Sequence, residues 1–202
     1  MAFSTPPTAK GVRQSDAIIE AAIRCLARDG YSASSLGRIA DEAGVQKRMV
    51  LYYFESREQL FDAVVRRIGD QLLAQVEGVL AGLEDPADLV AAGFDELWGR
   101  LTNDRALLSA YFGLVAESVT DPRLRDSVGE IGEGYRQLIR RLAREVRGGG
   151  RVAIDEQVLT VLIIAGIRGL MLEYLEHGDA PPLRDAIGVF QGWLSGAASP
   201  RR

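Results

Sequence analysis

The chain has 202 residues, 47% of them hydrophobic, which suffices for one or two domains with a real core and argues against disorder over most of the length. Its single cysteine, Cys25, excludes an internal disulfide framework and fits a reducing compartment. The formal net charge of −4 argues against a nucleic-acid partner, but residues 1–67 carry a balance of +2 and the remainder carries −6. Because phosphate affinity depends on the local patch, the N-terminal third stays compatible with DNA.

Neither a targeting segment nor a membrane span is expected. The first ten residues lack the long apolar run of a signal peptide. The longest apolar run, residues 158–172, contains Thr160 and Arg168 and is shorter than the roughly 20 residues that a spanning helix needs. These features predict a cytoplasmic protein with no membrane partner.

Apolar residues recur at helical spacing throughout, and no strand alternation of any length is present, so the predicted fold is all-α with about nine helices. Residues 1–12, which contain two prolines and Gly11, are expected to form a flexible arm that is either disordered or grazes the DNA. The first helix is predicted over about residues 15–28, because its apolar residues form one stripe. Gly30 ends this helix, since glycine takes the left-handed conformation at little cost.

Residues 34–61 have the layout of a helix-turn-helix, a motif that lays its second helix in the DNA major groove. Ser34 or Ser35 can cap the start of one short helix, and Gly44 provides the sharp turn after it. The next short helix covers about residues 46–54. The sequence therefore predicts that this third helix of the chain reads DNA.

A fourth helix, predicted over residues 57–80, joins the two halves of the chain. It opens with a capping box in which Ser56 and Gln59 satisfy each other's backbone donors. Further helices are expected near residues 86–101, 104–118, 122–147, 155–176 and 183–196. Their boundaries follow from prolines at first helical positions, as at Pro86, and from the glycine run at residues 148–150.

Polar side chains fill the first turn of the third helix, where side chains reach base edges. Arg48 has the geometry for a bidentate bond to guanine, and Gln46 for one to adenine. Lys47 suits a base or a phosphate, and Met49 completes the turn. The alternative is an ordinary solvated helix face, which is the more common explanation of such a pattern taken alone.

Phosphate contacts position a protein on DNA without reading its sequence. The candidates are Ser34, Ser35, Arg38, Tyr53 and Arg57. Free N–H groups and the helix dipole attract anions to a helix N-terminus, so the two serines can combine capping with a phosphate contact. Tyr52 and Phe54 are expected to belong to the core, because the third helix must pack back on the first.

Residues 13–67 resemble the DNA-binding domain of TetR-type transcriptional regulators. The matching segments are ARDGY, SSL, IADEAGV, LYYF and SREQL, at residues 27–31, 34–36, 39–45, 51–54 and 56–60. The resemblance implies a homodimeric repressor that binds a palindromic double-stranded DNA operator and is released by a small hydrophobic or amphipathic effector. It divides the chain into an arm (1–12), a helix-turn-helix DNA-binding domain (13–60) and an effector-binding and dimerisation domain (61–198).

One position departs from the family pattern. Leu51 stands where the family usually has a tyrosine that commonly contacts a phosphate. Tyr52 and Tyr53 are the candidates to replace that contact, and its absence is the alternative. Arg57 keeps the positive charge that the family usually places at the start of the fourth helix.

The helix predicted over residues 155–176 is apolar on nearly every side, and such a helix must be covered on every side. We therefore expect it to form a subunit interface with the last helix. The predicted interface residues are Val158, Leu162, Gly166, Gly169, Leu183, Ile187, Phe190 and Leu194. Fully intramolecular packing is the alternative, but a palindromic operator matches a two-fold protein.

An effector pocket is expected among the middle helices. Its candidate lining residues are Phe94, Trp98, Leu101, Tyr111, Phe112, Val115, Glu117, Tyr135 and Met171. Aromatic residues at helical spacing belong more often to a core, and Glu117 fits a surface salt bridge equally well. His177 is expected to cap a helix end rather than bind a metal, and no metal or cofactor is predicted.

An enzyme is a competing class, which the sequence does not support. Metal-ligand spacing, a GxSxG motif and a Walker loop are lacking, and Gly129, Gly132 and Gly134 lie in a helical pattern without a preceding strand. A third possibility is a ligand-binding protein of the same fold that has lost operator binding, which the departure at Leu51 leaves open.

Overall fold

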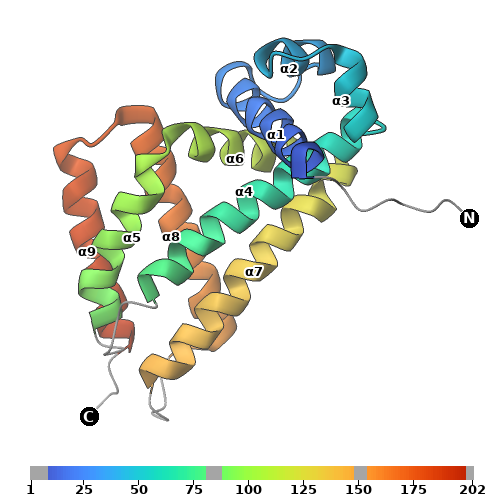
Figure 1. Cartoon of the computed structure of the whole chain (residues 1–202). Coiled ribbons are helices and arrows are strands. Elements are labelled where there is room, and N and C mark those ends of the chain that lie inside the picture. Colours follow the sequence, from blue (N-terminus) through green and yellow to red (C-terminus); the bar gives the residue numbers. More distant parts are fainter. Residues whose placement is uncertain (1–8, 81–87, 148–153, 199–202) are drawn as a thin grey trace, which may run out of the picture.

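The computed structural model describes residues 9–80, 88–147 and 154–198 (Figure 1). Over this part of the chain it consists of nine α helices without a strand, as predicted. The helices are α1 Ala9–Asp29, α2 Leu36–Glu42, α3 Lys47–Tyr53, α4 Arg57–Leu80, α5 Asp88–Asn103, α6 Arg105–Ser118, α7 Pro122–Arg147, α8 Glu156–His177 and α9 Pro181–Ala198.

Most helix boundaries lie within two residues of their predicted positions, because local signals set them. Asp104 and Asp155 cap α6 and α8 by accepting backbone N–H bonds with their side chains. Gly178, at φ 72°, ends α8 in the left-handed region that favours glycine. The predicted roles of Pro86 and of residues 148–150 lie outside the described residues.

The first helix differs from its prediction, because it begins at Ala9 rather than near residue 15. The assignment of residues 9–12 to a flexible arm is therefore wrong. Residues 9–14 contain no proline, and Gly11 weakens a helix by only about 1 kcal/mol, which a long helix tolerates. Residues 1–8 lie outside the described part of the chain.

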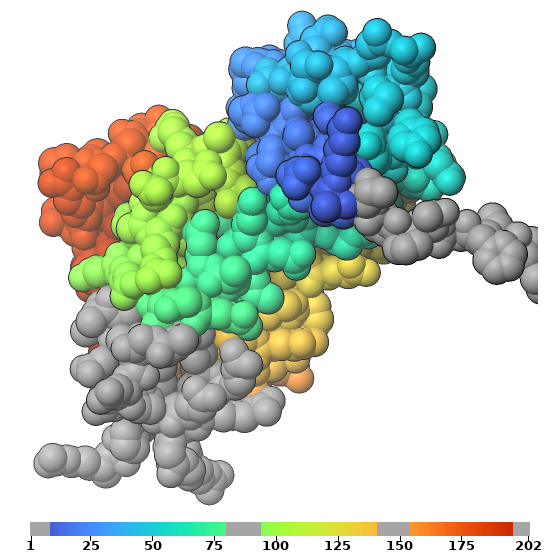
Figure 2. All heavy atoms as spheres, viewed as in Figure 1, coloured from blue at the N-terminus to red at the C-terminus, as the bar shows by residue number. Residues whose placement is uncertain are grey.

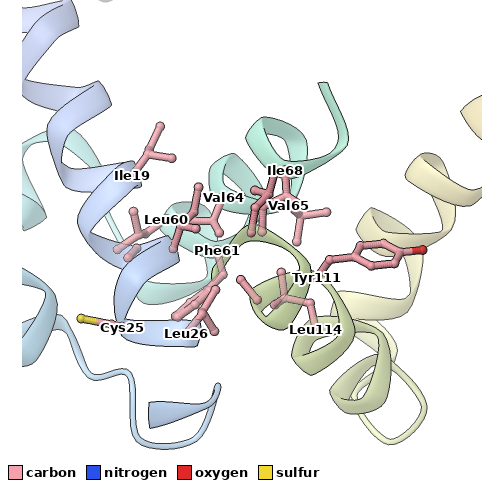
Figure 3. Close-up of a cluster of buried hydrophobic side chains, with 14 of the residues drawn as sticks. Ile19, Cys25, Leu26, Leu60, Phe61, Val64, Val65, Ile68, Tyr111 and Leu114 are labelled. Carbon is pink, nitrogen blue, oxygen red and sulfur yellow. The ribbon is translucent and has the colours of Figure 1, made fainter. Parts of the chain in front are cut away.

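One hydrophobic cluster joins the N-terminal helices to α4 and α6 (Figure 3). Leu26 of α1, Phe61 of α4 and Leu114 of α6 are all buried in it. The Ser109 hydroxyl of α6 also donates to the carbonyl oxygen of Ala27 on α1, at 3.5 Å. The helix-turn-helix and the rest of the protein therefore share one core.

Helices α4 and α7 run side by side (Figure 1). The Ser127 hydroxyl donates to the Asp62 carboxylate at 2.7 Å. Farther along, α7 comes so close to Gly69 that a Cβ there would lie 2.8 Å from Cγ1 of Ile131. The helix that links the two halves of the chain is thus held against α7 at two levels.

Helices α5, α8 and α9 enclose a second, smaller cluster. Leu183 and Ile187 are buried in it, and the Phe190 ring lies against Gly166 of α8. Leu194 packs against the same cluster. The prediction that Leu183 and Ile187 face a second subunit is wrong, because the apolar stripe of α9 buries them within their own subunit. Gly166, Phe190 and Leu194 are only partly buried.

The opposite side of α8 is exposed. Val158, Val161, Leu162 and Leu172 are exposed there, and Val189 is exposed on α9. By length and composition alone α8 could span a membrane, which corrects the expectation from its apolar run. It nevertheless packs against α6, α7 and α9 within the protein.

Replacing Gly166 by alanine is expected to destabilise the protein, because a Cβ at this position would overlap the Phe190 ring. Overpacking costs about 1–3 kcal/mol, which exceeds the gain of up to about 1 kcal/mol in helix propensity. Thermal and denaturant unfolding measure the difference. Gly129→Ala on α7, whose Cβ would meet nothing within 4 Å, is the control and should be neutral or stabilising. Equal stability of the two variants would contradict the packing.

Candidate nucleic-acid interface

Charged residues hold α2 against α1. Glu42, at the end of α2, accepts hydrogen bonds from Arg24 (2.8 Å) and Arg28 (2.9 Å). Asp29 forms ion pairs with Arg28 (3.0 Å) and Arg38 (3.2 Å). Hydrogen bonds from the arginines, chiefly Arg24 for Glu42 and Arg28 for Asp29, hold the pKa of both carboxyl groups below the usual range. We call these five residues the α1–α2 clasp.

The two serines before α2 have different environments. Ser35 is the N-cap of α2, with its exposed side chain accepting from the Arg38 N–H at 3.3 Å. Ser34 is fully buried, and its hydroxyl donates to the Gly30 carbonyl oxygen at 2.7 Å. The prediction of a phosphate contact for Ser34 is therefore wrong, because the turn before α2 directs this hydroxyl inward. Ser35 remains accessible.

The turn between α2 and α3 needs glycine at one position. Gly44 has φ 66°, a conformation that residues with a Cβ rarely adopt. The Val45 N–H donates to the Ala40 carbonyl at 2.9 Å, and the Val45 side chain packs against the core. The lobe that carries α2 and α3 stands apart from α9 in the space-filling view, where it is blue to cyan (Figure 2).

The inner side of α3 is apolar and its outer side is polar and aromatic. Val50 and Phe54 are buried, as predicted for Phe54. The exposed residues at this helix are Gln46, Lys47, Arg48, Leu51 and Tyr52, and the partly buried ones are Met49 and Tyr53. This is the side that the sequence predicts to face DNA.

Tyr52 does not belong to the core, contrary to the expectation. Its side chain is 77% exposed, and its ring centre lies 5.2 Å from that of Tyr53. Val50 and Phe54 are four positions apart and share the inner side, and Tyr52 lies midway between them, about 200° around the helix from each. Helix geometry thus turns Tyr52 outward.

Two pairs of exposed cations without a carboxylate partner among the described residues lie at helix starts. Four arginines of the N-terminal third are already bound to acidic side chains within it: Arg24, Arg28, Arg38 and Arg67. Lys47 and Arg48 have no carboxylate partner among the described residues. The same holds for Lys10 and Arg13, which are exposed at the start of α1. The sequence prediction allowed the arm that contains Lys10 to graze the DNA, but it named neither Lys10 nor Arg13 as a contact.

Arg57 has a structural position instead of the predicted phosphate contact. Its guanidinium carbon lies over the rings of Tyr31 (4.1 Å to the centroid) and Phe61 (4.5 Å). It donates to the carbonyl oxygens of Tyr31 (2.7 Å) and Ser34 (3.4 Å). The prediction for Arg57 is therefore wrong, because the backbone before α2 occupies its donors.

The predicted capping box at the start of α4 is half present. Ser56 accepts the Gln59 N–H at 3.2 Å, as predicted. The Gln59 side chain instead accepts from the N–H of Glu55, at 3.1 Å, one residue before Ser56. Both bonds still stabilise the helix start.

The predicted effector-lining residues lie in several places. Most belong to the main core: Leu101, Tyr111 and Met171 are buried there, and Phe112, Val115 and Tyr135 pack against it. Phe94 is buried in the second cluster, and Glu117 is partly buried on α6. Trp98 lines a pocket of about 410 Å³ between α5, α8 and α9, together with Tyr174.

The helix-turn-helix forms its own lobe and is followed in the sequence by a larger helical domain, an arrangement that defines a DNA-binding regulator. Residues 18–64 match the family described as bacterial regulatory proteins, tetR family. Residues 86–197 match the C-terminal domain of BetI-type transcriptional repressors. The chain belongs to the TetR family of transcriptional regulators.

Individual relatives agree with this assignment. The regulator RutR of Escherichia coli K12 is 43% identical over 180 residues, which cover 89% of this chain and 70% of RutR. The nicotine-responsive repressor HdnoR of Paenarthrobacter nicotinovorans is 24% identical over 168 residues, covering 83% of this chain and 87% of HdnoR. The fold is shared with FadR of Bacillus subtilis, solved with stearoyl-CoA, at a TM-score of 0.75 and 19% identity over 90% of this chain and 98% of FadR.

The α1–α2 clasp is expected to weaken as the pH falls from about 5 toward 3. The pKa values of Glu42 and Asp29 lie below the ordinary values of about 4.3 and 3.9, so their stabilisation is complete above those values and is lost as the pH falls through the folded-state pKa. Circular dichroism should show a shallower acid dependence of unfolding for Glu42→Gln. The control is Glu130→Gln, an exposed residue of α7. An unchanged acid profile in Glu42→Gln would rule out the clasp.

Proposed function

We propose that the protein is a homodimeric repressor that binds a palindromic operator through α3 and is released by a small effector in its C-terminal domain. The observation that carries this proposal is the outer side of α3, where unpaired Lys47 and Arg48 adjoin the exposed Gln46. Gly44 and the buried Val50 hold this side outward.

The first turn of α3 is proposed to read bases. Arg48 suits the O6 and N7 acceptors of guanine, and Gln46 suits the N6 and N7 groups of adenine. Lys47 adds a charge that serves either a base or a phosphate. Met49 is partly buried and offers an apolar contact to a thymine methyl group.

Phosphate contacts are proposed around this turn. Ser35 is exposed at the start of α2, and Arg38 is exposed although it pairs with Asp29. Tyr52 extends into solvent and supplies a hydroxyl beside Leu51, the position where the family usually has a tyrosine. Tyr53 is the second tyrosine candidate, and the exposed cations at the start of α1 extend the basic surface.

A second copy of the chain is proposed to cover the exposed apolar side of α8 and α9. The residues of this side are Val158, Val161, Leu162, Gly169, Leu172 and Val189. Exposed large apolar side chains gathered on one side are typical of a protein interface. The pairing is proposed to be two-fold, so that two copies of α3 read successive major grooves, about 34–36 Å apart.

The effector is proposed to act through α6 and α4. Helix α6 packs along α1, and α4 leads directly from the C-terminal domain to the helix-turn-helix. An effector shifts the protein away from its DNA-binding conformation only by binding the other conformation more tightly. HdnoR is named for nicotine and FadR was solved with stearoyl-CoA, so chemically unlike ligands occur with this fold.

A ligand-binding protein that has lost operator binding is the alternative, and the leucine at position 51 favours it. We propose no catalytic activity for either form, a cytoplasmic location and no membrane partner. The relatives are regulators rather than enzymes, which supports this view.

Arg48→Ala is expected to weaken binding to a palindromic site from the chain's own upstream region by about 1–3 kcal/mol, roughly 5- to 150-fold in Kd. Fluorescence anisotropy at fixed salt measures the change. Arg66→Ala on α4, an exposed arginine without a carboxylate partner among the described residues, is the matched control and should change binding little. If both variants bind the DNA equally well and independently of its sequence, specific base reading by α3 would be excluded.

Val161→Glu is expected to dissociate the dimer, because it places a charge in the proposed apolar interface. Sedimentation velocity should show a dimer for the unaltered protein and a monomer for the variant. Val119→Glu, at a residue that is 70% exposed after α6, is the control and should stay dimeric. A monomeric unaltered protein would refute the proposed interface.

A further inference from the structure

Arg168 is a partly buried cation in the apolar middle of helix α8. Its guanidinium carbon lies 5.7 Å from the ring centre of Tyr111 on α6. It has no carboxylate partner within the described ranges. A partly buried charge without a counter-ion is unfavourable, so Arg168 is suited to bind an anion from outside the chain.

Two tyrosine hydroxyls lie near this cation. Tyr111 is buried, and in Figure 3 its hydroxyl points away from the hydrophobic cluster. Burial raises the pKa of Tyr111 and of Tyr135 on α7, and in both cases Arg168 partly opposes the shift. Both hydroxyls are therefore protonated at neutral pH and able to donate. The Tyr135 hydroxyl has no hydrogen-bond partner in the part of the chain that the structure describes.

Gln75 on α4 adds an unpaired acceptor. Its side-chain oxygen is buried and has no hydrogen-bond partner among the residues that the structure describes. Gln75 follows the buried Leu72 by three positions and precedes the buried Val79 by four, so all three share the inner side of α4.

The register between α4 and α7 brings Gln75 to the level of Tyr135. A Cβ at Gly134 would lie 3.9 Å from the Leu73 side chain, so the turn of α4 that contains Gln75 runs beside the turn of α7 that contains Tyr135. An unpaired buried polar group costs about 1–3 kcal/mol, which a ligand with a matching donor would recover.

We propose that Gln75, Tyr111, Tyr135 and Arg168 form the polar lining of the effector site, and that the effector is a small organic acid carrying a hydroxyl or N–H group. This inference rests on the proposed function, which places an effector in this domain. The carboxylate accepts charge-assisted hydrogen bonds from Arg168 and hydrogen bonds from the tyrosine hydroxyls. The hydroxyl or N–H group donates to the Gln75 oxygen.

The charge of this lining selects against an amine. Arg168 is its cation, and none of its four members is a carboxylate that could balance a second positive charge. A neutral ligand satisfies Gln75 but leaves Arg168 without a counter-ion. An acid satisfies both groups, which is why the lining favours this class.

Calorimetric titration tests the anion site with three probes: 4-hydroxyphenylacetate, 4-hydroxybenzoate and indole-3-acetate, each beside its primary amide. At least one acid should bind about 10- to 150-fold more tightly than its amide, as a hydrogen-bonded charge implies. Arg168→Met should abolish that preference. Arg100→Met, which removes an exposed arginine of α5 paired with Glu96, should preserve it. If no acid exceeds its amide, or if Arg168→Met keeps the preference, the proposal is overturned.

Gln75→Leu tests whether the hydroxyl or N–H group of the ligand donates to the Gln75 oxygen, and this variant is expected to fold. Removing an unpaired buried acceptor should raise the melting temperature of the ligand-free protein by about 2–4 °C. The variant should also bind 4-hydroxyphenylacetate no better than phenylacetate, whereas the unaltered protein prefers the hydroxylated acid. An unchanged preference in Gln75→Leu would overturn the assignment of this residue.

Operator binding separates this inference from the proposed function. If an acid binds through Arg168 but does not release the operator, the site is supported and the release mechanism fails. If the operator is released by other compounds with equal potency in Arg168→Met, the release mechanism is supported and the acid site is overturned.

Discussion

The buried stripe of α4 is the constraint on which the rest of the structure depends. Its apolar residues recur on one side from Leu60 to Val79, first in the core shared with α1 and α6 and then beside α7. A helix of 24 residues is about 36 Å long, so one rigid element reaches from the helix-turn-helix to the interior of the second domain. Arg57 fixes its first turn to the loop before α2. The orientation of α3 therefore depends on how α4 is packed.

Local charge pairing explains how an acidic chain can present a basic surface. Four of the eight acidic side chains in residues 1–67 pair with arginines of α1, α2 and α4: Asp16, Glu20, Asp29 and Glu42. Among the described residues, Lys10, Arg13, Lys47 and Arg48 lack such partners and are exposed at the starts of α1 and α3, and Arg66 is likewise exposed on α4. Because salt screens charges over about 10 Å, these nearby cations matter more to a phosphate than the distant negative charge of the C-terminal domain.

Helix α8 faces a different environment on each of three sides. Two of these sides are apolar, which explains why most of its side chains are apolar. One side packs with α9 through Gly166 and Phe190, and another exposes valines and leucines that suit a second copy. Between these sides, Arg168 faces Tyr111. A charged residue retained in this apolar stretch is costly unless something pairs with it, and the anionic effector that we propose would supply that partner.

The sequence by itself determined the helices, the helix-turn-helix and the family, because caps and turns act between residues only a few positions apart. Gly30, Ser35 and Gly44 have their predicted local roles for this reason. Only the tertiary structure decided where individual side chains point. Arg57 turned inward because it bonds the backbone of Tyr31, 26 positions earlier, and Leu183 and Ile187 joined their own subunit. The Ser34 hydroxyl bonds the nearby Gly30 carbonyl, but its burial depends on the helices packed around the turn. A helix pattern shows which residues share a side, but the neighbour that covers that side is fixed by packing across the whole chain.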